Sequence, residues 1–189
     1  QPAMAGMTEG RWAGQDSFWT WRALMSRFLD RLGPEDVQAI AAQAMVEMAE
    51  SGFASVCEFH YLHHGVDGAR GTEMAEAVID AAHATGIRLT LLPVLYLAGG
   101  FDRPAQPEQR RFLHASVDEY LEFVERLMPI AAAGGARLGI APHSLRAVPA
   151  RELPALQQGA RRLLGAVAPF HIHVAEQVAE VEQCHAAHG

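Results

Sequence analysis

The stretch Phe170-His171-Ile172-His173-Val174-Ala175-Glu176-Gln177 decides the fold prediction for this chain. Apolar residues alternate in it with two histidines, which predicts a strand on which His171 and His173 share one face. Glu176 falls just past the end of that strand. A metal-dependent hydrolase uses such a pair, because the imidazole holds the ion and the acid moves protons for the water that the ion activates. An isolated His-x-His pair on an apolar strand is more often structural, so a metal-binding role needs support from the rest of the sequence.

Helices and strands alternate along the rest of the chain. Apolar residues at helical spacing and closing glycines such as Gly52 and Gly86 indicate the helices, and a short apolar strand follows each one. Mostly apolar strands that alternate with amphipathic helices indicate parallel βα units. The expected strands are 53–59, 87–95, 137–141 and 170–174, and the expected helices are 17–32, 34–52, 73–85, 116–133, 151–166 and one from about Gln177.

Polar side chains gather where the expected strands end: Glu58, His60, Tyr61, His63 and His64, then Tyr96, then His143, Ser144 and Arg146, and finally His171, His173 and Glu176. Barrels of eight βα units build active sites at this edge, and doubly wound sheets bind ligands there. No glycine-rich phosphate loop follows a strand, which disfavours a nucleotide-binding doubly wound sheet. We therefore expect a partial (β/α)8 TIM barrel with about four of the eight units. Residues 1–189 would form part of a single barrel domain that is truncated at both ends.

Composition narrows the class of protein further. The 189 residues carry 15 basic and 22 acidic side chains, a net charge of −7, and no basic block that would follow a nucleic acid. No apolar run approaches the roughly 20 residues that span a bilayer, so we expect no membrane partner. The two cysteines form no disulfide framework, which favours a cytoplasmic location, and Cys57 is expected to be buried inside its strand.

Six stretches of the chain, in order, resemble the formimidoylglutamate deiminases, a family of the amidohydrolase superfamily. The resemblance spans essentially the whole chain and is therefore specific. The matching stretches are 3–9 (AMAGMTE), 16–22 (DSFWTWR), 58–64 (EFHYLHH), 91–96 (LLPVLY), 143–148 (HSLRAV) and 171–177 (HIHVAEQ).

The resemblance implies a zinc-dependent barrel of the amidohydrolase type. It would hydrolyse N-formimino-L-glutamate to N-formyl-L-glutamate and ammonia in histidine degradation. By the same resemblance, His173 is a metal ligand and Glu176 is the catalytic acid/base, while substrate contacts come from Gln1, Tyr61, His143 and Arg146. A guanidinium such as that of Arg146 suits a bidentate grip on a carboxylate, which a glutamate derivative offers twice.

The resemblance also implies that most zinc ligands lie outside this chain. A His-x-His pair would precede residue 1, and a histidine and an aspartate would follow residue 189. A catalytic zinc normally needs three protein ligands, so the 189 residues alone are expected to be inactive. The expected partner is a small molecule with carboxylates, and a homodimer is left open.

Several alternatives stay open from the sequence. His60, His63 and His64 are dense enough to suggest a second metal site, but no carboxylate or thiolate accompanies them, so we favour supporting roles. His171 is expected to lie in the barrel interior. A different deaminase acting on a heterocycle is the alternative enzyme, and a non-catalytic half-barrel that binds a partner is the alternative outside enzymes. Arg146 discriminates between the two enzymes, because a neutral ring has no carboxylate to hold.

Overall fold

The computed structural model describes residues 28–189 of the chain. Gln1 and most of the predicted helix 17–32 lie outside this range, and only Phe28 and Leu29 of that helix are described as helical. Within residues 28–189, no helix is both long and apolar enough to cross a membrane.

The described chain alternates between helices and strands, as the sequence predicts. Helix α2 (Pro34–Glu50) leads to strand β1 (Ser55–His60), and α3 (Glu73–Thr85) leads to β2 (Arg88–Leu95). A short 3-10 turn η2 (Pro107–Gln109) precedes α4 (Val117–Ala133), which is followed by β3 (Arg137–Leu138) and β4 (Ala141–Pro142). The turn η3 (Ala150–Glu152) opens α5 (Leu153–Leu164), and α6 (Val178–His188) ends the chain.

Local signals at the helix ends explain these boundaries. The hydroxyl of Ser116 accepts a hydrogen bond from the backbone N–H of Glu119, which caps the start of α4. Helix α3 ends at Gly86, which adopts φ 76°. Glycine reaches this left-handed conformation without the steric cost of a side chain, so β2 can start directly after the turn.

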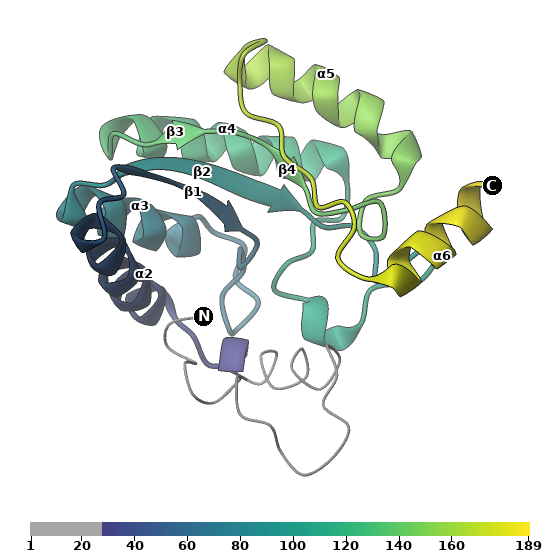
Figure 1. Ribbon diagram of the computed structural model, residues 1–189, viewed down its shortest axis with the longest axis horizontal. Coiled ribbons are helices and arrows are strands. Elements are labelled where there is room, and N and C mark those ends of the chain that lie inside the picture. Colours follow the sequence, from purple (N-terminus) through teal and green to yellow (C-terminus); the bar gives the residue numbers. More distant parts are fainter. Residues whose placement is uncertain (1–27) are drawn as a thin grey trace.

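The strands form one parallel sheet. Strand β1 pairs with β2 from Ser55↔Arg88 to His60↔Pro93, and both β3 and β4 pair with β2 on its other side. The arrowheads of β1 and β2 point the same way in Figure 1, toward the loops and α6. The residues that follow each strand therefore meet at one edge of the sheet.

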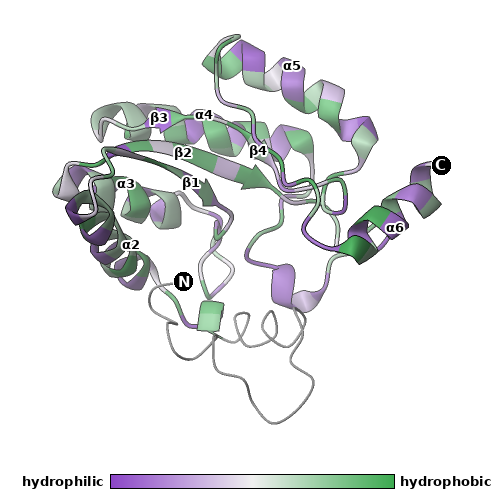
Figure 2. Ribbon diagram, in the orientation of Figure 1, coloured by the Kyte–Doolittle hydropathy of each residue, from purple (hydrophilic) through white to green (hydrophobic). Residues whose placement is uncertain are grey.

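The described helices α2 to α5 all lie over one face of this sheet. Helices α3 and α4 contact β2, while α2 packs on α3 and α5 packs on α4, so the helices form an arc around the strands (Figure 1). Hydrophobic and hydrophilic residues alternate along these helices in Figure 2, as expected for helices half-buried against a sheet. The core between the layers includes Leu89, Leu91, Phe123 and Leu127.

The opposite face of the sheet carries a smaller apolar cluster beneath the loops. Its buried members are Leu92, Val94 and Ala141, with Phe59 and Tyr61 packed against them. Cys57 lies on this face farther from the loops and is exposed, so the prediction of a buried thiol was wrong. The reason is geometric: side chains at 57 and 59 alternate away from the helices, and no described segment covers Cys57.

Two predicted strands differ from the structure. The expected strand 137–141 is divided into β3 and β4, with Gly139 between them. A Cβ at Gly139 would lie 2.5 Å from Leu92 Cδ2 and 2.7 Å from the carbonyl oxygen of Pro169, so only glycine lets these three segments meet.

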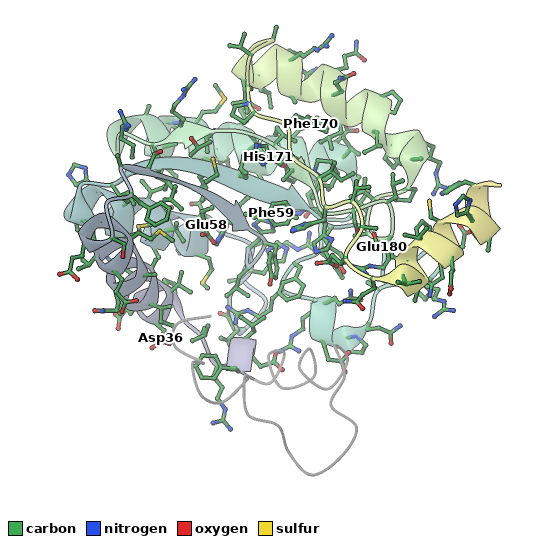
Figure 3. All side chains as sticks on the ribbon, in the orientation of Figure 1. Asp36, Glu58, Phe59, Phe170, His171 and Glu180 are labelled. Atoms are coloured by element: carbon green, nitrogen blue, oxygen red, sulfur yellow. The ribbon has the colours of Figure 1, made fainter. Side chains whose placement is uncertain are left out.

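Segment 170–174 is extended but does not form the predicted strand. It makes a single parallel bridge, Ile140↔Phe170, and no described segment pairs with its other side. Phe170, Ile172 and Val174 are accordingly exposed, as the position of Phe170 along the rim of the sheet in Figure 3 illustrates.

Candidate active site

The backbone of segment 170–174 brings His143 and His173 together. The N–H of His143, directly after β4, donates to the carbonyl of Leu95 at the end of β2 (3.0 Å). The N–H of His173 then donates to the carbonyl of His143 (3.0 Å). The two imidazole rings lie with their centroids 5.3 Å apart as a result. The predicted histidines of two successive βα units therefore share one site.

Aromatic side chains from the other strands hold these two rings. Phe59 meets His173 edge to face with the centroids 4.2 Å apart, and Tyr96 meets His143 in the same way at 4.8 Å. Tyr61 lies 6.3 Å from His143 between ring centroids. On the remaining side, the Nδ1 atom of His143 lies 3.0 Å from the hydroxyl of the buried Ser144. The imidazoles are thus oriented by packing before any ligand arrives.

A carboxylate completes a set of three groups that could hold a metal ion. One ligand atom each from His143, His173 and Glu176 lies within 4.8 Å of the others. Two imidazole nitrogens and a carboxylate oxygen are donors that zinc accepts. Zinc binds such atoms at about 2.0–2.2 Å, so side-chain rotations that bring the three atoms closer together would allow them to hold an ion. The residues present fit a metal such as zinc.

Arg146 occupies the centre of the charged part of the site. Its Nη2 donates to Glu176 Oε2 (2.6 Å), and its Nη1 lies 3.6 Å from Glu180 Oε2. Burial would raise the pKa of Glu176, but the hydrogen bond from Arg146 and the charges of His143, Arg146 and His173 lower it below its ordinary value. The carboxyl group of Glu176 is therefore ionised at neutral pH, as a proton acceptor has to be.

Five of the six predicted site residues come together in the structure. Tyr61, His143, Arg146, His173 and Glu176 all lie at the carboxyl edge of the sheet, while Gln1 lies outside the described residues. His171, two positions before His173, is exposed on the extended segment (Figure 3), and no described segment covers it, so the expected interior position was wrong for the described residues.

Sequence reasoning missed three contributors. The sequence patterns indicate Tyr96 only as a polar residue at a strand end, and they single out neither Phe59 nor Glu180. The alternation of β1 could have pointed to Phe59, which faces the same side as Tyr61. Glu180 stands in the first turn of a predicted helix, where an acid is common, so its type alone carried no signal.

A second group of histidines lies beside the site and is built differently. We call His60, His63, His64 and His114 the buried histidine cluster, since each is at most 5% exposed. The Nε2 of His63 bonds with the carbonyl of Val94 (2.8 Å) and that of His64 with the carbonyl of Leu113 (2.6 Å). Arg111 closes the cluster by donating its Nε–H to the carbonyl of His64 (2.8 Å). The hydrogen bonds of His63 and His64 join neighbouring segments of the fold, which is consistent with the supporting roles expected from the sequence.

Burial keeps this cluster uncharged. It lowers the pKa of His60 from 6.5 to about 4. Burial together with the charges of His64, Arg70 and Arg126 lowers the pKa of His114 to about 3. The pKa of His63 falls well below its ordinary value, first through burial and then through repulsion by His114 and His60. The imidazoles are neutral in the folded protein at physiological pH.

Comparisons with known proteins identify the family. The amidohydrolase family model matches residues 5–189, and the chain belongs to that family. The chain is 45% identical to the formimidoylglutamate deiminase of Pseudomonas aeruginosa over 193 aligned residues, which cover all of this chain and 42% of that enzyme. The fold matches the crystal structure of an amidohydrolase from Brucella melitensis with a TM-score of 0.88 and 44% identity, covering 98% of this chain and 41% of that one.

A more distant structure shares the fold alone. It is a mutant of the atrazine chlorohydrolase TrzN from Arthrobacter aurescens, with a TM-score of 0.66 and 17% identity, covering 90% of this chain and 38% of that one. These matches confirm the predicted fold, a partial (β/α)8 barrel of the amidohydrolase type. The chain spans less than half the length of the relatives that it matches.

Proposed function

We propose that these residues form the middle of the active site of a zinc-dependent deiminase, which hydrolyses N-formimino-L-glutamate to N-formyl-L-glutamate and ammonia. One observation carries the proposal: a buried guanidinium and an ionised carboxylate lie beside two imidazoles that can contribute to a metal site. The 45% identity to a formimidoylglutamate deiminase supports this particular reaction over others of the family.

Each residue has a distinct role in the proposed reaction. His173 would hold zinc with ligands from outside these residues, and bound zinc supplies a water whose pKa is lowered toward about 7. Glu176 takes a proton from the water that attacks the formimino carbon, and it delivers the proton to the departing nitrogen. The second proton of the water, on the hydroxyl of the tetrahedral adduct, follows the same route as the bond from carbon to that nitrogen breaks, so the formyl C=O forms and ammonia leaves. Such acid/base catalysis typically contributes about 10² to 10⁴ in rate.

Substrate recognition falls to the remaining predicted residues. Arg146 binds a carboxylate of the substrate, and Tyr61 and His143 contact the substrate beside it. Gln1 is proposed to add a further contact. Of the three converging groups, His143 and Glu176 act on the substrate and water in this proposal, which leaves His173 as the metal ligand. Because a catalytic zinc normally needs three protein ligands, residues 1–189 alone should not turn over substrate.

The replacement Arg146→Met tests the substrate assignment. Hydrogen bonds to charged groups contribute about 1.5–3 kcal/mol each, so kcat/KM for N-formimino-L-glutamate should fall roughly 10²- to 10³-fold in the full-length protein. Turnover of an uncharged heterocyclic substrate, the alternative, would change far less. Arg151→Met is the matched control, since that side chain is 75% exposed and should be dispensable. Equal losses on the two substrates would contradict the assignment.

A further inference from the structure

Glu180 is the most buried carboxylate in the described part of the chain, at 6% exposed. Figure 3 shows it at the beginning of α6, where the helix meets the loops that leave the sheet. An acid in the first turn commonly serves only the helix, through its favourable interaction with the free N–H groups there. The side chain of Glu180 instead turns back toward the site. Its Oε2 accepts from the N–H of Glu176 (3.1 Å) and lies 3.6 Å from Arg146 Nη1.

Two nitrogens of the Arg146 guanidinium face carboxylates, and the third has no partner among the described residues. Nη1 faces Glu180, whereas Nη2 donates to Glu176 (2.6 Å). Nε is buried and has no hydrogen-bond partner among residues 28–189. The parallel N–H bonds of Nε and Nη2 form the edge that grips a carboxylate in a bidentate manner. A ligand carboxylate could satisfy both atoms at once if Glu176 moved aside.

The two carboxylates differ in how firmly they are held. Glu180 is on a helix, and its side chain is 6% exposed, whereas Glu176 is in the preceding loop with a side chain that is 28% exposed. Moving Glu180 would leave a buried cation poorly compensated, which is costly. Moving Glu176 would return a half-open carboxylate toward solvent and toward the imidazoles beside it.

We propose that Glu180 is a positioning residue that anchors Arg146 through Nη1, so that its Nε–Nη2 edge faces the substrate carboxylate. Glu176 then occupies that edge only until substrate arrives, and the incoming carboxylate releases it for proton transfer. Binding of the substrate's acid group and freeing of the catalytic carboxylate become one event. This inference rests on the proposed function for the identity of the substrate, but the anchoring of Arg146 can be tested without turnover.

The test measures binding of N-formyl-L-glutamate to the full-length, zinc-loaded protein by calorimetry. Replacing Glu180 by Gln should weaken binding about 10- to 100-fold, as is common for residues that orient a binding group. Glu182→Gln, on an exposed position of the same helix, is the matched control and should leave binding unchanged. When Arg146 is already Met, Glu180→Gln should cost less than about twofold, because Glu180 acts through that side chain.

Glu180→Asp separates positioning from a structural role. It keeps the charge but shortens the side chain, so it should bind better than the isosteric Glu180→Gln, whereas a packing role predicts the reverse order. Equal losses with and without Arg146, or unchanged binding in Glu180→Gln, would overturn the inference, as would a wild-type protein that does not bind N-formyl-L-glutamate. Binding without hydrolysis of N-formimino-L-glutamate would instead refute the proposed reaction and leave the role of Glu180 standing.

Discussion

Two groups of histidines lie within the same edge of the sheet, and only one of them is arranged for metal chemistry. The buried histidine cluster has four imidazoles, yet they bond to carbonyls of β2 and of the loop before α4 or meet one another edge to face. The site pair, His143 and His173, has only two, but they converge with Glu176. Among residues 28–189, no other three side chains of the kinds that bind metals lie this close together. For holding a metal ion, the number of histidines therefore matters less than a carboxylate nearby and ligand atoms that lie close together.

The comparison also predicts that substitutions in the two groups have different effects. The cluster is buried and neutral, so its contribution is to packing and to stability. The site pair stands at an open rim, where His173 is exposed and lines a largely apolar cavity of about 270 Å³ beside α6. Substitutions in the cluster should affect folding, and substitutions at the site should affect activity.

The largest effect is expected from His173→Ala in the full-length protein. A catalytic metal stabilises the transition state by several kcal/mol, and each 1.36 kcal/mol is a factor of ten in rate, so kcat/KM should fall roughly a thousand-fold. Steady-state kinetics and a thermal melt of the variant give the measurement. His171→Ala, two residues earlier on the same segment, is the control and should change kcat/KM less than about threefold. Similar losses in both variants would show that the whole segment matters and not His173 in particular.

The second largest effect is expected from low pH, which should reduce the stability of the fold through the buried histidine cluster. The unfolded chain takes up protons as the pH falls through 6.5, but folded His60 and His114 stay neutral until about pH 4 and 3. The free energy of unfolding is therefore not reduced by these histidines above pH 6.5, and it decreases as the pH falls below 6.5. Each buried histidine should cost up to about 1.4 kcal/mol per pH unit in that window. Urea unfolding between pH 7.5 and 5 measures this slope, and a flat profile would contradict the neutral cluster.

A smaller effect is expected from His114→Phe, which keeps a planar ring against Tyr120 and Phe123. Neither ring nitrogen of His114 has a partner among the described residues, so an apolar ring of similar shape should cost little at pH 7.5. At pH 5 the variant should be more stable than the wild type by about 1–2 kcal/mol. His83→Phe, on the exposed side of α3, should leave the pH profile unchanged. A variant that is less stable than the wild type at pH 5 would show that His114 makes a polar contact.

Much of this arrangement could be predicted from the sequence because parallel βα units repeat. Helix 73–85 was predicted with its observed bounds, since Gly86 ends it and an apolar strand begins at once. Arg146 and Glu176 belong to different units, but parallel strands carry both to the same edge, so their meeting could be expected.

The rest depends on packing between segments that no local pattern records. Segment 170–174 has the alternation of a strand, but a strand needs partners along its length, and the described neighbours supply one bridge. Cys57 is exposed because the face that it shares is uncovered there. The proposed role of Glu180 depends on where α6 lies relative to the turn after β4, which carries Arg146. Arg146 and Glu176, the residue that Glu180 also contacts, are 30 residues apart along the chain. Such placement follows from the assembled structure alone.

The zinc content of the full-length protein tests the contrast between the two histidine groups most directly. After dialysis against excess metal-free buffer, the wild type and His114→Phe should each retain about one zinc ion per chain. His173→Ala should lose it while keeping a normal melting curve at pH 7.5. Zinc retained in His173→Ala but lost from His114→Phe would contradict the account, because it would assign the metal to the buried histidine cluster.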